Sequence, residues 1–169
     1  MKPTLFILCG YPFAGKSTLC RKIVTNNSSV VHFCIDTFFD EHPEIRDEED
    51  RWTYVFQYGR ELSCQAIRSG KHVLYDATNY LKKERAKLRK MAKECGGECA
   101  VIYAEIPMAI ARQRLEENRL SRSRRDVDEL AWEEVTGDFE MPTVDENVIV
   151  YRFDDDLEEW IEKVFGHLH

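Results

Sequence analysis

The strongest constraint on the fold is the nine-residue stretch over residues 10–18, which reads GYPFAGKST. The residues before it, 3–9, are mostly apolar and β-prone, so they predict a buried strand. After the stretch, the spacing of Leu19, Ile23 and Val24 predicts one face of a helix. A strand, a glycine-containing loop and a helix in this order are typical of a phosphate-binding loop, so we expect the chain to bind a nucleoside triphosphate.

Each part of the G-x-x-x-x-G-K-[ST] pattern has a task in holding phosphate. Gly10 and Gly15 allow consecutive backbone N–H groups to turn toward the α- and β-phosphates, and Lys16 reaches the β- and γ-phosphates. The Ser17 hydroxyl is the predicted Mg²⁺ ligand, and the helix that starts near Gly15 adds the positive end of its dipole. The residues predicted to bind nucleotide here are Gly10, Tyr11, Pro12, Phe13, Ala14, Gly15, Lys16, Ser17 and Thr18.

Two further predicted strands each deliver an aspartate. Residues 30–36 are β-branched and aromatic and end in Asp36, and a strand over about residues 72–75 is followed by Asp76. Ligands bind beyond the carboxyl ends of the strands in an open α/β sheet, so both carboxylates are expected at the phosphate-binding loop. A carboxylate in this position commonly holds Mg²⁺, which makes Asp76 the second predicted metal ligand. The simpler alternatives are a solvated or capping Asp36 and an Asp76 that only caps the next helix.

Strands and helices alternate along the rest of the chain. Two more strands are predicted over residues 99–107 and 147–153, with helices between all five strands. This order predicts an α/β P-loop NTPase fold with a five-stranded, parallel, doubly wound sheet. A length of 169 residues predicts a single domain over residues 1–169. Asn79 is predicted to cap the helix after the third strand, and Asp126 with Glu129 to form a capping box.

The cysteines show no paired spacing. The six of them, at positions 9, 20, 34, 64, 95 and 99, mostly sit in apolar segments without a C-x-x-C pattern, so we expect reduced buried thiols rather than disulfides or a zinc site. His32, His42 and His72 also lack metal-ligand spacing, and no function is assigned to them. The N-terminal apolar run is too short for a signal peptide or a membrane span, so a cytoplasmic protein is expected.

The net charge of −7 is unevenly distributed. Residues 36–50 hold eight acids against one arginine. Within this acidic segment, residues 40–50, which contain Pro43 and are poor in apolar periodicity, predict a loop or broken helix. Residues 82–93 hold seven bases against one acid, which is most simply a solvated helix face. Residues 112–125 hold six arginines against two glutamates after the fourth strand. That position suits a lid over transferring phosphates, because Arg presents fixed donors to phosphate oxygens.

Missing signatures narrow the class. The chain has no Asn-Lys-x-Asp for guanine and no LSGGQ-like signature of a transporter ATPase, so the arginine-rich segment favours a kinase. The chain resembles the small P-loop kinases that include polynucleotide 5′-kinase domains, seryl-tRNA kinases and zeta-toxin-like phosphotransferases. The resemblance covers nearly the whole chain, and its most specific part is IRSGKHVLYDATN with an arginine, Arg85, nine residues after Asp76. The other matching parts are GYPFAGKST, the Asp36 strand end, RLSRSRR and FEMP.

The resemblance implies transfer of the ATP γ-phosphate to a hydroxyl acceptor with Mg²⁺ as cofactor. It implies that Asp36 is the general base, and that Lys16, Arg122 and Arg125 neutralise charge during the transfer. The resemblance implies that some of Arg119, Arg122, Arg124 and Arg125 contact the triphosphate from an arginine-rich lid over about residues 119–126. Arg119 and Arg122 are the two expected first.

The sequence departs from the polynucleotide kinases at the acceptor site. Those kinases carry Asp-x-x-Arg, whereas Asp36 is followed by Thr37, Phe38 and Phe39, and the acidic segment repels a polyanion. The expected acceptor is a small molecule or a tRNA-borne hydroxyl, with tRNA contact by residues 82–93 as a minority interpretation. The alternatives are a polynucleotide 5′-hydroxyl kinase and a nucleotide-gated accessory ATPase of a tRNA-modifying complex (Kti12-like).

Four aromatic residues alternate with other residues shortly after the acidic segment. We expect half of them in the core and half in the wall of the acceptor pocket. They are Trp52, Tyr54, Phe56 and Tyr58.

Overall fold

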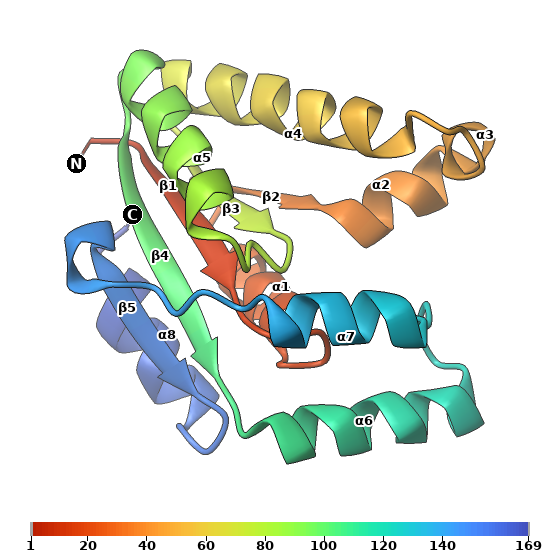
Figure 1. Cartoon of the computed structure of the whole chain (residues 1–169). Coiled ribbons are helices and arrows are strands. Elements are labelled where there is room, and N and C mark those ends of the chain that lie inside the picture. Colours follow the sequence, from red (N-terminus) through yellow and green to blue (C-terminus); the bar gives the residue numbers. More distant parts are fainter. Residues whose placement is uncertain (1, 169) are drawn as a thin grey trace.

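The computed structural model describes residues 2–168, and its centre is one parallel β-sheet (Figure 1). The strand order is β2-β3-β1-β4-β5, so the predicted five-stranded parallel sheet is confirmed. Because β1 pairs with both β3 and β4, the loop that follows β1 lies in the middle of the carboxyl edge. The strands are β1 (Thr4–Cys9), β2 (Val30–Cys34), β3 (His72–Asp76), β4 (Glu98–Glu105) and β5 (Val148–Arg152).

Helices cover both faces of the sheet because alternate side chains of β1 point to opposite faces. Leu5 and Ile7 join a core with α4 and α5, whereas Phe6 and Leu8 join a core with α1 and α8. Figure 1 shows helices on both sides of the sheet. No helix within residues 2–168 is both long and apolar enough to cross a membrane. The helices are α1 (Lys16–Asn26), α2 (Ile35–Glu41), α3 (Pro43–Arg46), α4 (Arg51–Arg68), α5 (Lys82–Glu94), α6 (Met108–Ser121), α7 (Glu129–Gly137), the 3₁₀-helix η1 (Val144–Glu146) and α8 (Leu157–Phe165).

A third, smaller core lies beyond the carboxyl edge. Ala111 and Leu115 of α6 and Trp132 of α7 pack with Phe13 of the phosphate-binding loop and with Ile106 after β4. This packing brings the arginine-rich segment that connects α6 to α7 close to the loop. The acidic segment forms the short helices α2 and α3, so the expected broken helix is present.

The predicted cap at Asn79 is wrong. Helix α5 begins at Lys82 after Leu81, without a side-chain cap. Asn79 is 8% exposed, and its amide donates to the Leu8 carbonyl at 2.7 Å instead. The physical reason is that a buried amide between two strands needs a partner there, and the β1 carbonyl supplies it.

The predicted capping box at Asp126 and Glu129 is also absent. The N-cap of α7 is Asp128, which accepts a hydrogen bond from the Ala131 amide at 2.8 Å. Asp126 instead accepts from Arg119 at 3.3 Å. Its carboxylate therefore serves the connection between α6 and α7 rather than the helix terminus.

The expectation that every cysteine is reduced is wrong for one pair. Cys64 of α4 and Cys95, which follows α5, form a disulfide with their Cα atoms 5.5 Å apart. The two residues are separated by 31 positions and meet because α4 and α5 pack side by side on one face of the sheet. Sequence spacing therefore gives no sign of the bond. Cys9, Cys20, Cys34 and Cys99 are free thiols.

The prediction that half of the four aromatic residues at the start of α4 lie in the core is wrong. Val55 and Gly59 face the sheet instead, and a Cβ on Gly59 would lie only 2.6 Å from the Phe33 ring. The helix is thus rotated so that its smallest residues meet the sheet. Trp52, Tyr54, Phe56 and Tyr58 are all at least 40% exposed.

Candidate nucleotide-binding site

The phosphate-binding loop connects β1 to α1 and depends on its two glycines. A Cβ on Gly10 would lie 2.9 Å from the Ala104 carbonyl oxygen, so no larger residue fits between β1 and β4. Gly15 has a φ of 94°, a left-handed conformation that glycine adopts without steric cost. Phe13 adopts a φ of 63°, which is uncommon for a residue with a side chain. The backbone is therefore held in a tight turn with positive φ at Gly10, Phe13 and Gly15, the kind of loop from which anion-binding nests are built.

Lys16 brings a positive charge into this turn. The side chain is only 7% exposed, and its ammonium donates to the Gly10 carbonyl at 3.0 Å and the Tyr11 carbonyl at 2.7 Å. Burial lowers the pKa of Lys16, although the nearby Asp76 carboxylate opposes that shift. A charged donor surrounded by polarised backbone groups is suited to the oxygens of a polyphosphate.

Asp76 lies next to Ser17 and is almost fully buried, at 4% exposure. Burial alone would raise the pKa of Asp76, but hydrogen bonds from His32 and Ser17 and the charge of Lys16 outweigh it and lower the pKa. The carboxylate is therefore held in its charged form. The structure brings the two predicted metal ligands together, and their oxygen atoms fit the preference of Mg²⁺ for oxygen donors.

Asp36 reaches the site from a helix rather than from a strand end. Strand β2 stops at Cys34, and Asp36 occupies the first turn of α2, where the helix dipole favours a negative charge. Its side chain is 44% exposed, and its Oδ2 lies 3.5 Å from an Nη of Arg124. A carboxylate at this place is accessible to a substrate hydroxyl.

Arg124 is the predicted-lid residue that connects the two sides of the site. Besides its ion pair with Asp36, its guanidinium lies 4.4 Å from the Phe13 ring centre. Its backbone is fixed by Asn118, whose side chain is buried and exchanges hydrogen bonds with the Arg124 amide and carbonyl, both at 3.0 Å. No sequence motif marks Asn118 as a site residue, because a lone asparagine in a helix belongs to no recognisable pattern.

The other predicted arginines are placed differently. Arg119 binds Glu116, Asp126 and Glu129 in a surface network of ion pairs. Arg122 ends α6 in a left-handed conformation and is exposed, and the Arg125 guanidinium lies 5.0 Å from the Phe39 ring centre. Among the described residues, none of the three has a hydrogen bond or ion pair to the phosphate-binding loop.

A cavity of about 350 Å³ adjoins the loop on the side of α8. Arg114 of α6 lies in its wall and donates to the Phe13 carbonyl at 3.2 Å. Aromatic rings and a guanidinium are surfaces on which a planar heterocycle stacks. Arg114 lies within the arginine run of the sequence, but only the packing of α6 on the loop distinguishes it. The cavity is lined by Phe13, Ala14, Gly15, Thr18, Leu19, Arg114, Arg124, Tyr151, Phe153 and Leu157.

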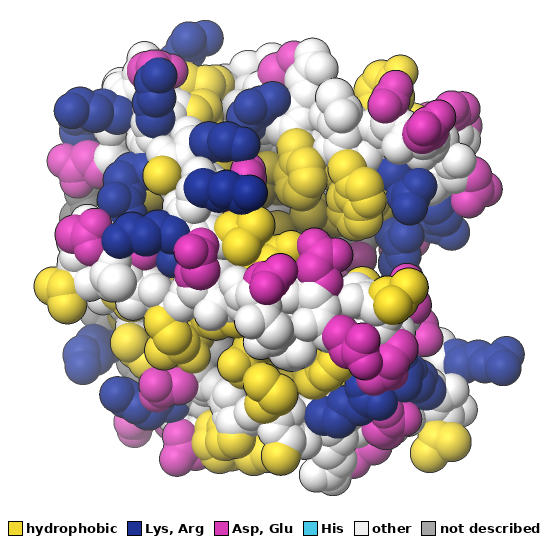
Figure 2. All heavy atoms as spheres, viewed as in Figure 1, with side chains coloured by type: hydrophobic (Ala, Val, Ile, Leu, Met, Phe, Trp, Pro, Cys, Tyr) yellow, Lys and Arg dark blue, Asp and Glu magenta, His cyan; other side chains and the backbone are white. Residues whose placement is uncertain are grey.

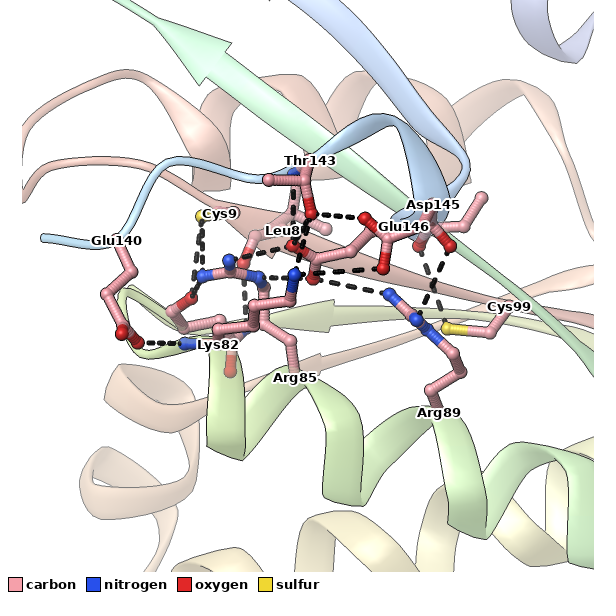
Figure 3. A network of polar contacts seen from close by, with 12 residues as sticks. Leu8, Cys9, Lys82, Arg85, Arg89, Cys99, Glu140, Thr143, Asp145 and Glu146 are labelled. Carbon is pink, nitrogen blue, oxygen red and sulfur yellow. Dashed lines mark hydrogen bonds and ion pairs between the residues drawn. The ribbon is translucent and has the colours of Figure 1, made fainter.

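Arg85 has a structural place behind the site. It is fully buried and donates to both carboxylate oxygens of Glu146, at 2.8 and 3.0 Å, as Figure 3 shows. A third bond, at 2.9 Å, reaches the carbonyl of Asn79. Arg85 thereby ties the turn after Asp76 to η1. Glu146 is 1% exposed and lies 61 residues from Arg85 in the chain, so no local sequence pattern indicates this pair.

The charged segments lie apart on the surface. Figure 2 shows basic side chains gathered at the upper left, where Figure 1 places α5, and acidic side chains at the upper right, where it places α3. Within the basic run, Arg85 is buried, and Lys87 and Lys90 pair with glutamates of the same helix. These local pairs reduce the free positive charge that α5 offers to a partner.

Comparisons with known proteins agree with this geometry. A family model described as "AAA domain" (AAA_33) matches residues 5–142. An L-seryl-tRNA(Sec) kinase from Methanococcus maripaludis is 26% identical over 114 residues, which is 65% of this chain and 44% of that protein. The chain therefore spans less than half the length of this curated relative.

Two solved structures have the same fold over the whole chain. A putative kinase from Chloroflexus aurantiacus matches with a TM-score of 0.79 and 14% identity, covering 100% of both chains. Kti12 from Chaetomium thermophilum, in complex with ADP-AlF3, matches with a TM-score of 0.73 and 18% identity, covering 99% of this chain and 100% of that chain. At identities of 14% and 18%, the likeness to these two structures shows a shared fold and nothing more.

Proposed function

The chain belongs to the AAA domain family that its sequence matches, and from this premise we propose that it is an ATP-dependent kinase that transfers the γ-phosphate to a hydroxyl acceptor. The single observation that carries the proposal is the facing pair of Asp36 and Arg124 across the mouth of the phosphate-binding loop. The proposed unit is one kinase domain over residues 1–169, with a lid segment at residues 119–126. A cytoplasmic location is part of the same proposal.

The residues divide the chemistry between them. Asp36 accepts the proton of the acceptor hydroxyl, whose oxygen then bonds to the γ-phosphorus while the bond from that phosphorus to the β–γ bridging oxygen breaks. ADP leaves with the electrons of that bond, and Asp36 later returns its proton to water. Lys16 and Arg124 stabilise the negative charge that shifts toward the bridging oxygen.

Ser17 and Asp76 are the residues that would hold Mg²⁺. When bound, the ion offsets phosphate charge and orients the transferring group. The role of the protein is to keep two oxygen donors charged or polarised and side by side. The hydrogen bonds from His32 and Ser17 and the charge of Lys16 keep Asp76 charged against the opposing effect of burial. The cavity next to the loop, with Arg114 and Tyr151 in its wall, is the proposed place of the nucleobase.

Charge restricts the acceptor. The acidic segment after Asp36 repels a polyanion, and Phe39 stands where an arginine clamp would hold a terminal phosphate. We therefore expect a neutral or cationic hydroxyl compound, or a tRNA-borne hydroxyl held at a distance by residues 82–93. The kinase name of the M. maripaludis relative favours the tRNA-borne acceptor.

A screen with γ-labelled ATP tests the proposal. Nucleosides, sugars, antibiotics, 5′-hydroxyl oligonucleotides and total tRNA are offered at low and high salt. Label on a small acceptor that is indifferent to salt, or on tRNA with a steep loss at high salt from counterion release, supports the proposal. Efficient labelling of short oligonucleotides would overturn the charge argument and favour the polynucleotide 5′-hydroxyl kinase.

The second candidate is an accessory ATPase that hydrolyses ATP slowly and transfers phosphate only to water. The observation that favours it is Phe39 at the position where polynucleotide kinases carry the arginine that holds the acceptor, so that no acceptor clamp follows Asp36. The fold shared with Kti12 is consistent with either candidate. In the same screen, this candidate predicts label in inorganic phosphate alone, at a rate that no acceptor changes.

A further inference from the structure

A cysteine, a histidine and an aspartate from three different elements meet beside the phosphate-binding loop. The ligand atoms of Cys20, His32 and Asp76 all lie within 4.8 Å of one another. Cys20 lies on α1, one turn after Ser17, while His32 lies on β2 and Asp76 ends β3. His32 Nε2 is already 3.1 Å from Asp76 Oδ2. The fold, rather than local sequence spacing, creates this cluster.

The donor set differs from that of a magnesium site. Mg²⁺ prefers oxygen ligands, whereas a thiolate and an imidazole suit Zn²⁺ and similar borderline-soft ions. Zinc bonds of about 2.0–2.3 Å in a tetrahedron place neighbouring ligand atoms roughly 3.3–3.8 Å apart, so the cluster needs to contract by about 1.5 Å at most. We propose that Cys20, His32 and Asp76 form a binding site for Zn²⁺ or an ion of the same class, with the fourth position open to water.

Burial holds two ligands of this site in place. Cys20 is fully buried in the core under α1, and Asp76 is 4% exposed, so both ligands are already held in place before an ion arrives. The His32 side chain is 17% exposed and gives the cluster its contact with solvent. When the sulfur–zinc bond forms, the thiol proton leaves to water. The thiolate and the Asp76 carboxylate then balance the two charges of the ion.

The shared carboxylate makes zinc a regulator of the kinase, and this step rests on the proposed function. Asp76 is the proposed Mg²⁺ ligand with Ser17, and one carboxylate drawn toward Cys20 and His32 is no longer available to Mg²⁺ at Ser17. Zinc in the cluster and MgATP in the loop therefore exclude each other. Zinc lowers the affinity for MgATP, and by linkage MgATP lowers the affinity for zinc by the same factor.

Metal titrations of the protein with its Cys64–Cys95 disulfide intact and without nucleotide test the site directly. Zn²⁺ is titrated against a competing chelator, and Co²⁺ is used as a coloured substitute whose thiolate charge-transfer band appears only when a cysteine ligates the ion. We expect one equivalent of metal and a thiolate band. The absence of saturable binding, or binding of Co²⁺ without the band, would overturn the site.

Matched variants assign the ligands. Cys20→Ala should abolish the cobalt band, and His32→Gln should weaken zinc binding at least tenfold, since even outer-shell partners of metal ligands are worth that much. Cys99→Ser and His42→Gln, which alter the same residue types away from the cluster, should leave both readouts unchanged. The same zinc affinity in His32→Gln and His42→Gln would show adventitious binding, and thermal unfolding of each variant verifies that it is folded.

Competition separates this inference from the kinase proposal. Adding MgATP to the zinc-loaded protein should release zinc, and His32→Gln should become less sensitive to zinc in ATP binding. If zinc binds at the three ligands but MgATP does not displace it, the regulatory step is wrong and the site stands. If no acceptor is ever phosphorylated, the kinase proposal fails, yet the metal titration still decides the site.

Discussion

Lys16 is the residue on which nucleotide binding most depends. Its ammonium is buried and bonded to two carbonyl oxygens of its own loop, at 2.7 and 3.0 Å. Phosphate oxygens are stronger acceptors than carbonyls because they carry charge, so a triphosphate in the loop offers Lys16 better partners. The depressed pKa of Lys16, caused by burial, rises again next to a polyanion.

Replacing this charge tests the loop. We expect Lys16→Ala to reduce ATP turnover by about 10²-fold or more, the usual effect of losing one preorganised donor to a transition-state anion. Lys22→Ala is the matched control, since Lys22 lies on the same helix and makes an exposed ion pair with Glu158. Isothermal titration with ATP and steady-state kinetics measure both variants. Normal ATP turnover by Lys16→Ala would contradict the assignment of residues 10–18 as the phosphate-binding loop.

Asp76 is expected to determine how the activity depends on Mg²⁺ concentration, rather than to take part in proton transfer. Asp76→Asn removes the buried negative charge beside Ser17, so the Mg²⁺ concentration for half-maximal activity should rise while ATP still enters the loop. Glu105→Gln is the control, because Glu105 also ends a strand at this edge but pairs with Arg152 at 3.0 Å. Equal Mg²⁺ dependence in Asp76→Asn and Glu105→Gln would contradict the metal role.

At the scale of the elements, the connection between α6 and α7 has both anchored and free parts. Asn118 fixes the backbone of Arg124, and Arg119 is tied to three carboxylates. The exposed residues between them have few apolar anchors. Local opening is inexpensive where few apolar groups are buried, so this connection is the part of the site best able to move.

Amide hydrogen exchange measures that motion. We expect residues 119–126 to exchange quickly without nucleotide and slowly with MgATP, because bound phosphate gives the arginines partners that hold the lid segment closed. Arg124→Ala should lose most of this protection. Arg112→Ala, which removes ion pairs with Glu116 and Glu129 and the contact with the Trp132 ring but no contact with Asp36 or Phe13, should keep it. Equally slow exchange with and without nucleotide would identify a static surface segment.

The buried pair of Arg85 and Glu146 links α5 to η1 and makes stability depend on pH. Burial would raise the pKa of Glu146, but hydrogen bonds from Arg85 and the Thr143 amide outweigh it, so the pKa is lowered. The stabilisation is therefore fully present above the unfolded-state pKa of about 4.3 and is lost as the pH falls through the lower folded-state value.

Denaturant unfolding between pH 7 and pH 3 tests this link. Glu146→Gln should cost about 3–5 kcal/mol at pH 7, because Arg85 remains buried without a charged partner, and should flatten the loss of stability in acid. Asp40→Asn, which breaks the exposed pair with Arg46, should cost about 1 kcal/mol or less. Similar losses of unfolding free energy in Glu146→Gln and Asp40→Asn would show that the buried Arg85–Glu146 pair stabilises the protein no more than an exposed pair does.

At the scale of the whole molecule, the sequence predicted those features that local patterns encode. The glycine loop, the apolar strands and Asp76 after β3 follow from short-range spacing, and the parallel sheet follows from their order. Features that depend on packing between distant segments were not visible. These include the Glu146 partner of Arg85, the contact of His32 with Asp76, and the disulfide between Cys64 and Cys95. Asn79 does not cap α5 as its local sequence position predicts, because its buried side-chain amide donates a hydrogen bond to the Leu8 carbonyl of β1.

The central claim is that Asp36 directs phosphate to a hydroxyl. The most direct measurement is the partition of γ-label between acceptor and inorganic phosphate, with the best acceptor from the screen, in wild type, Asp36→Asn and the control Glu41→Gln from the same helix. We expect label mainly on the acceptor in wild type and Glu41→Gln, and transfer reduced by about 10²-fold or more in Asp36→Asn with unchanged MgATP affinity. Label in inorganic phosphate alone for all three proteins, or normal transfer by Asp36→Asn, would contradict it.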